Sequence, residues 1–164
     1  MKTIAKNFLY IAALFLLLTN AACEQENLEP ELAVAPGGGT LTGYSAYTIS
    51  AATADDVYGR VVFWKSNTGG TLVQISLYNT AEGVDYTTGI FDGTVADGAT
   101  TKLMDFYTIS GATGEFSTHK FFVIENKDFY SSLTDLDGHV KILSGADVIA
   151  SGDVGLNATP VEKK

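Results

Sequence analysis

The sequence is poor in the residue types that build most catalytic and metal sites. Its 164 residues include one cysteine, Cys23, and two histidines, His119 and His139. A single cysteine excludes an intramolecular disulfide and a zinc site built from cysteines. Basic residues are also scarce, with ten against nineteen acidic ones and a net charge of −9. Nucleic acid is therefore excluded as a partner, because phosphate binding needs a basic face.

The first 22 residues have the features of a secretory signal peptide. Lys2 and Lys6 supply the positive start, and the uncharged apolar run Phe8–Leu18 follows them. A run of about eleven residues fits a signal peptide, but a membrane-spanning helix needs about 20. We therefore set residues 1–22 aside from the folded domain.

Small residues lead from this run into the single cysteine, in the order Thr-Asn-Ala-Ala-Cys at residues 19–23. The segment resembles the lipobox of bacterial lipoproteins, in which cleavage precedes the cysteine and the cysteine is acylated. Asn20 departs from that pattern, since an aliphatic residue is usual three positions before the cysteine. Cleavage by ordinary signal peptidase is the alternative, but it leaves Cys23 without a role. We predict lipidation at Cys23 and an outer-membrane lipoprotein of the cell envelope, whose membrane anchor carries palmitate or a similar acyl chain.

Residues 23–39 have the composition of a tether. Four glutamates and no base lie between residues 24 and 31, and Ala-Pro-Gly-Gly-Gly follows at 35–39. Such a segment buries too little apolar surface to order itself. An acidic run after the cysteine also resembles the surface-export signal of Bacteroidetes lipoproteins, so periplasmic and surface-facing placements both stay open.

Residues 40–159 are predicted to form one all-β domain, followed by a tail at 160–164. Alternating apolar and polar residues and β-branched or aromatic runs predict short strands separated by glycine-containing turns. One helical stretch is expected over Asp128–Leu136. These features favour a β-sandwich or a partly open barrel. The predicted strands are Tyr44–Ala51, Tyr58–Lys65, Thr71–Asn79, Thr88–Val95, Leu103–Ile109, Thr118–Glu125, His139–Leu143 and Val148–Val154.

Four segments carry a resemblance to a known family. They lie at residues 57–63, 71–77, 136–142 and 149–158, and the last contains the sequence Gly-Asp-Val-Gly at 152–155. Together they resemble the CHRD-domain lipoproteins of Bacteroidetes, a family named after chordin. The resemblance implies an antiparallel sandwich of the immunoglobulin-like or Cu/Zn superoxide dismutase-like kind.

The chain departs from this family at its histidines. Many bacterial members carry a His-x-x-His-x-His cluster and one further histidine that look able to bind a metal. By position, Tyr86, Gly89, Phe91 and Leu143 stand there instead, and none of them carries an imidazole. We therefore expect no metal site at these positions.

The remaining candidates for a site are generic. His119 and His139 are expected to be exposed or half-exposed and not to share a metal. Asp92 and Asp97 could pair as an acid and a base, although scattered surface acids are the simpler explanation. Residues 135–138 resemble a fragment of a calcium loop but are predicted to be a turn between helix and strand. Aromatic residues are more often core than binding surface; they are Tyr44, Tyr47, Tyr58, Trp64, Tyr78, Tyr86, Phe91 and Phe106.

The sequence thus predicts a non-catalytic binding or structural module with no cofactor. Its partners are expected to be the membrane, through the lipid anchor at Cys23, and an unidentified protein or glycan. A metal-dependent redox protein and a glycan- or calcium-dependent adhesion module are the alternatives.

Overall fold

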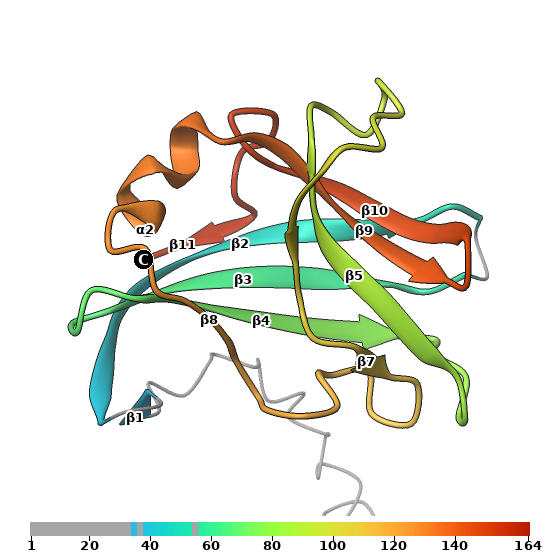
Figure 1. Cartoon of the computed structure of the whole chain (residues 1–164), viewed down its shortest axis with the longest axis horizontal. Helices are drawn as coiled ribbons and strands as arrows, with labels where there is room; N and C mark the ends of the chain where they lie inside the picture. Colours follow the sequence, from blue (N-terminus) through green and yellow to red (C-terminus); the bar gives the residue numbers. More distant parts are fainter. Residues whose placement is uncertain (1–33, 36–37, 54–55) are drawn as a thin grey trace, which may run out of the picture. The chain divides into compact units, whose positions relative to one another are not determined.

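The computed structural model describes residues 34–35, 38–53 and 56–164, and this part of the chain is mostly antiparallel β-structure (Figure 1). The predicted all-β class is confirmed. The elements are β1 (Val34–Ala35), β2 (Gly39–Ala51), β3 (Tyr58–Ser66), β4 (Thr71–Tyr78), β5 (Asp85–Asp92), β6 (Lys102–Asp105), β7 (Ile109–Ser110), β8 (Phe122–Ile124), α2 (Phe129–Ser132), the 3₁₀ turn η1 (Leu133–Asp135), β9 (Asp137–Ser144), β10 (Asp147–Gly155) and β11 (Glu162–Lys163).

The strands form one curled sheet whose two halves face each other. Its order is β6-β5-β9-β10-β2-β3-β4-β8, with β1 and β11 added beside β2 and β7 beside β5. The two halves are joined by β10 and β2, whose paired register is confined to Ala150 with Ala51 and Ser151 with Ser50. At this short seam the sheet turns back on itself, so that the arrangement is sandwich-like (Figure 1).

The main core lies between the two halves. Val61 and Phe63 of β3 point into it from one half, and Val140 and Ile142 of β9 point into it from the other. Side chains alternate between the two faces of a strand. His139, Lys141 and Leu143 therefore point to the outer face of β9.

A second apolar cluster explains the unbroken run Val-Val-Phe-Trp at residues 61–64. Val62 and Trp64 lie on the face of β3 opposite to Phe63 and pack with Leu72 of β4 and with Phe121. The indole Nε1 of Trp64 donates to Gln74 Oε1 at 3.3 Å. A strand that is buried on both faces has no exposed face for polar side chains. Its sequence is therefore continuously apolar and does not alternate between apolar and polar residues.

The predicted elements are found, with several bounds changed; the expected strand Thr88–Val95 corresponds to β5, which begins and ends three residues earlier. The hairpin between β3 and β4 is confirmed, and Gly69 in its turn has a φ of 95°. The expected strand Leu103–Ile109 is divided into β6 and β7, and Thr118–Glu125 shortens to β8. The helical stretch is confirmed as α2 followed by η1, and residues 135–138 form the passage from η1 into β9.

The ends of the domain differ from the expected boundaries. The sheet already contains β1 and the start of β2, which fall in the range expected as tether, and β11 forms where a tail was expected. β11 pairs with β2, and Glu162 also lies 3.6 Å from the guanidinium of Arg60. The signal peptide, Cys23 and residues 24–33 lie outside the described residues. Among the described residues, no helix is long and apolar enough to cross a membrane.

Substitution of two aromatic residues on β3 tests how much the core contributes to the free energy of unfolding. Phe63 has no exposed surface, whereas Tyr58 is 46% exposed and stacks only on Tyr78. We expect Phe63→Ala to lower the free energy of unfolding by about 3–5 kcal/mol, because it removes buried surface and leaves a cavity. Tyr58→Ala is the matched control and should cost at most about 1 kcal/mol. Urea unfolding measures both, and equal losses would contradict the placement of the core.

Candidate functional site

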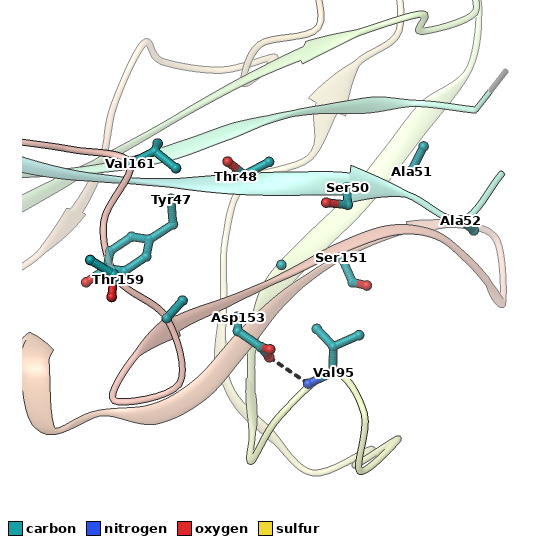
Figure 2. Close-up of a pocket in the computed structure, with 12 residues that line it drawn as sticks. Tyr47, Thr48, Ser50, Ala51, Ala52, Val95, Ser151, Asp153, Thr159 and Val161 are labelled. Carbon is teal, nitrogen blue, oxygen red and sulfur yellow. Dashed lines mark hydrogen bonds between the residues drawn. The ribbon is translucent and has the colours of Figure 1, made fainter. Parts of the chain in front are cut away.

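A groove of about 480 Å³, lined by both polar and apolar side chains, follows the seam between β2 and β10 (Figure 2). Thr48 and Ser50 of β2 and Ser151 and Asp153 of β10 contribute polar side chains to its lining. The other lining residues are Tyr47, Ala51, Ala52, Val95, Gly152, Ala158, Thr159 and Val161. In Figure 2 Val95 lies on one side of the groove and Thr159 and Val161 lie on the other.

Glycine at position 152 allows the two strands to meet so closely. A Cβ at this position would overlap the carbonyl oxygen of Thr48 on β2. Gly155, at the end of β10, has a φ of 66°, and a Cβ there would overlap the carbonyl oxygen of Leu136. The Gly-Asp-Val-Gly segment singled out in the sequence thus marks the place where β10 approaches β2 and then turns away from it.

The groove offers hydrogen bonds and little charge. Thr48 and Ser50 are exposed, Ser151 and Asp153 are half-buried, and no lysine or arginine is among the lining residues. Tyr47 is 1% exposed; burial raises the pKa of its hydroxyl, and a hydrogen bond with the backbone of Gly155 opposes that shift. The phenol therefore stays neutral at physiological pH. The site suits a neutral ligand that carries hydroxyl or amide groups, and its carboxylate disfavours anions.

One side of the groove belongs to residues 93–101, which connect β5 to β6 and which we call the strap. Three side chains from neighbouring strands hold its backbone. The ring Nδ1 of His139 lies 2.8 Å from Gly93 O, and Lys141 Nζ donates to Ala99 O at 2.6 Å. The amide of Val95 donates to Asp153 Oδ1 at 2.7 Å, the hydrogen bond drawn in Figure 2.

Asp97 closes a turn inside the strap. Its Oδ2 accepts hydrogen bonds from the amide and the hydroxyl of Thr94, at 3.1 and 2.6 Å. These bonds hold the pKa of the Asp97 carboxyl below its ordinary value, and a proton added to the ring of His139 would act in the same direction. Among the described residues no hydrogen bond joins Asp97 to Asp92. The carboxylate of Asp97 serves a turn, and nothing in these contacts supports an acid–base pair.

The expected exposure of His139 is wrong. The side chain has no exposed surface, and its ring stacks on Phe91 of β5 with 5.9 Å between the ring centroids. The sequence places His139 beside an Asp-Gly turn, which favours exposure, but the strap covers this face of β9 and lies about 40 residues earlier in the chain. His119 is exposed as expected. Its ring packs edge-on against Tyr107, with 5.9 Å between the ring centroids.

The four positions that the sequence resemblance aligns with histidines of CHRD-domain proteins do not meet at one point. Gly89 and Phe91 lie on the outer face of β5, opposite Lys141 and His139 in register, and Leu143 lies on the same face of the sheet. Tyr86 points the other way, into the core, where its hydroxyl accepts a hydrogen bond from the amide of Ala81.

No metal-ligand cluster is found elsewhere in the part of the chain that the structure describes. Groups of three or more His, Cys, Asp or Glu side chains placed to hold a metal ion are absent from these residues. Nothing here assigns a metal-binding role to either histidine.

Most of the candidate aromatic side chains belong to the interior. Tyr58 and Tyr78 are the exceptions, because both are 46% exposed and stack on each other at 5.3 Å between centroids. Tyr44 is half-buried against Trp64. The buried ones are Tyr47, Trp64, Tyr86, Phe91 and Phe106.

Comparison with known proteins gives no relative: no family model, no curated protein and no solved structure matches the chain.

The turn in the strap predicts a pH effect with a definite sign. Because the pKa of Asp97 is lowered in the folded protein, its ionised form stabilises the turn above the ordinary pKa of about 3.9, and this stabilisation is lost as the pH falls through the folded value. We expect Thr94→Ala to raise the pKa of Asp97 towards the ordinary value. An NMR titration of the Asp97 carboxyl carbon measures this shift. Thr100→Ala, in the same strap, is the control, and an unchanged midpoint in Thr94→Ala would refute the assignment.

Proposed function

We propose that the protein is a lipid-anchored module of the cell envelope with a CHRD-like β-sandwich, which binds a partner and catalyses no reaction. The observation that carries the proposal is the order of segments along the chain. A signal-like apolar run and four small residues precede the single cysteine, an acidic and glycine-containing segment follows it, and a β-domain comes next. The all-β fold and the groove along the seam of β2 and β10 support the proposal.

The acyl chains of Cys23 are the means of attachment. Each buried CH₂ contributes about 0.8 kcal/mol, so one chain holds a protein only marginally and two or more hold it stably. Without Lys2 and Lys6 the chain from Cys23 onward has eight bases against nineteen acids, a net charge of −11. A domain of this charge is repelled by anionic lipid, so electrostatic attraction does not supply the attachment.

The groove chemistry favours binding over catalysis. Neither histidine is among the lining residues to act as a base for the aliphatic hydroxyl groups of the groove, which belong to Thr48, Ser50, Ser151 and Thr159. The ring of His139 lies beneath the strap with no exposed surface. Hydroxyl groups beside a single carboxylate, Asp153, are suited to hydrogen bonding with a neutral polyol. A neutral glycan is therefore the ligand class that we propose for the groove.

The anchor is tested by metabolic labelling in a bacterium that processes lipoproteins. We expect labelled palmitate in the wild-type protein and none in Cys23→Ala, because the thiol and the new amino group of residue 23 are the acylation sites. Asn27→Ala, in the same segment, is the control and should label normally. Equal labelling of the wild type and Cys23→Ala would refute acylation at Cys23.

The groove is tested by filling it. Ser50→Trp places a large ring in the groove, whereas Ser131→Trp places the same ring on the exposed surface of α2. On an array of neutral and acidic glycans we expect the wild type and Ser131→Trp to bind neutral glycans, and Ser50→Trp to bind them at least about tenfold more weakly. Measurements with calcium and with a chelator separate this mode from calcium-dependent adhesion. Absence of glycan binding, or equal binding by Ser50→Trp, would remove the groove as a glycan site.

A further inference from the structure

The outer face of β9 holds polar side chains that are buried beneath the strap. His139 has no exposed surface and Lys141 is 8% exposed, although both lie on the face of β9 that points away from the core. Burial of such groups is costly unless they are hydrogen-bonded. Each of them meets this requirement through one carbonyl of the strap, Gly93 O for His139 and Ala99 O for Lys141.

The ring of His139 is only half satisfied. A carbonyl oxygen accepts hydrogen bonds and cannot donate them, so Nδ1 carries the proton that is directed at Gly93 O. The lone pair then lies on Nε2, and this buried atom has no hydrogen-bond partner. The arrangement fits the neutral imidazole. A second proton, on Nε2, would create a buried charge and a buried donor without an acceptor.

Charged groups surround the ring on each packed element, but none of them accepts from Nε2. Lys141, two residues along β9, directs its ammonium towards the ring of Phe91 at 4.8 Å, and Lys102 of β6 lies 5.6 Å from the same ring. Both add positive charge beside the stack of Phe91 and His139.

The nearby carboxylates already hold the strap. Asp153 of β10 lies opposite His139 in register, and its Oδ1 accepts from the amide of Val95. Asp97 belongs to the strap itself, and its Oδ2 accepts from Thr94. Asp92, at the end of β5, and Asp137, two residues before His139, are exposed. An acceptor for Nε2, either a carboxylate or water, therefore requires the strap to move.

We propose that the strap is an acid-sensitive cover, which proton uptake at Nε2 of His139 releases from the outer face of β9. Imidazole is the side chain whose ordinary charge change falls between about pH 5 and 8, so a proton on Nε2 is the charge that acid would add beneath the strap. Because Val95 lines the groove, release of the strap also changes one side of the groove. This inference goes beyond the proposed function and does not depend on which ligand the groove binds.

The test compares amide hydrogen exchange at pH 7.5 and pH 5.0 by NMR, expressed as protection factors to remove the pH dependence of the intrinsic rates. We expect the protection of the Val95 amide to fall at least about tenfold in acid, while the amides of Val140 and Ile142 in the core keep theirs. The midpoint of this loss should coincide with the titration of the His139 ring, followed on the same sample.

Two variants separate His139 from other titrating groups. His139→Asn keeps a donor for Gly93 O but does not titrate, so its strap should stay protected at pH 5.0. His119→Gln removes the exposed histidine and should behave as the wild type does. Wild-type measurements decide the question even if His139→Asn fails to fold, because His119 is an internal reference. A strap that keeps its protection while His139 titrates, or that loses it only near pH 4 with the carboxylates, would overturn the proposal.

Discussion

The close approach of β10 to β2 is the constraint on which the rest of the structure depends. The two strands connect the halves of the sheet, yet their paired register is confined to two residue pairs. Gly152 permits this approach, because any side chain there would overlap the carbonyl oxygen of Thr48. The turn of the sheet at this seam brings β9 opposite β3, so that Ile142 and Phe63 share one core. The same geometry leaves outward-pointing hydroxyl groups along the seam, and these become part of the groove lining.

The strap covers the outer face of β5 and β9, where an apolar and a polar side chain would otherwise be exposed. Phe91 and His139 form an apolar and polar stack on that face, and neither is exposed. A loop that crosses such a face must satisfy its own backbone groups as well as the buried side chains. The strap and the buried side chains satisfy each other's hydrogen-bonding groups. Carbonyls of the strap accept from His139 and Lys141, and Asp153 accepts from an amide of the strap. The strap is thus ordered by polar contacts, and it contributes little to the apolar core.

Local patterns in the sequence were sufficient for the fold class and for most strands, and long-range contacts were needed for the site. The hairpin of β3 and β4 is encoded by alternation and by a glycine turn between neighbouring segments, so it is predicted nearly residue by residue. Burial of His139 depends on the strap, about 40 residues earlier in the chain. The residues that flank His139 in the sequence give no indication of its contact with the strap. The groove escaped prediction for the same reason, because Ser50 and Ser151 come together only when the sheet curls. The Gly-Asp-Val-Gly segment stood out in the sequence only through its resemblance to a family, and the need for Gly152 at the seam became apparent from the structure.

Asp153 links the groove to the strap. It lines the groove from β10, and its Oδ1 accepts from the amide of Val95, which lines the groove from the other direction. A ligand that engages this carboxylate competes with the strap for the same acceptor, whereas a ligand that uses the hydroxyls of Ser50 and Ser151 leaves the strap in place. By linkage, any ligand that binds better to one position of the strap must shift the strap towards that position by the same free energy. Asp153 is thus the side chain through which a ligand that engages its carboxylate would couple the occupancy of the groove to the position of the strap.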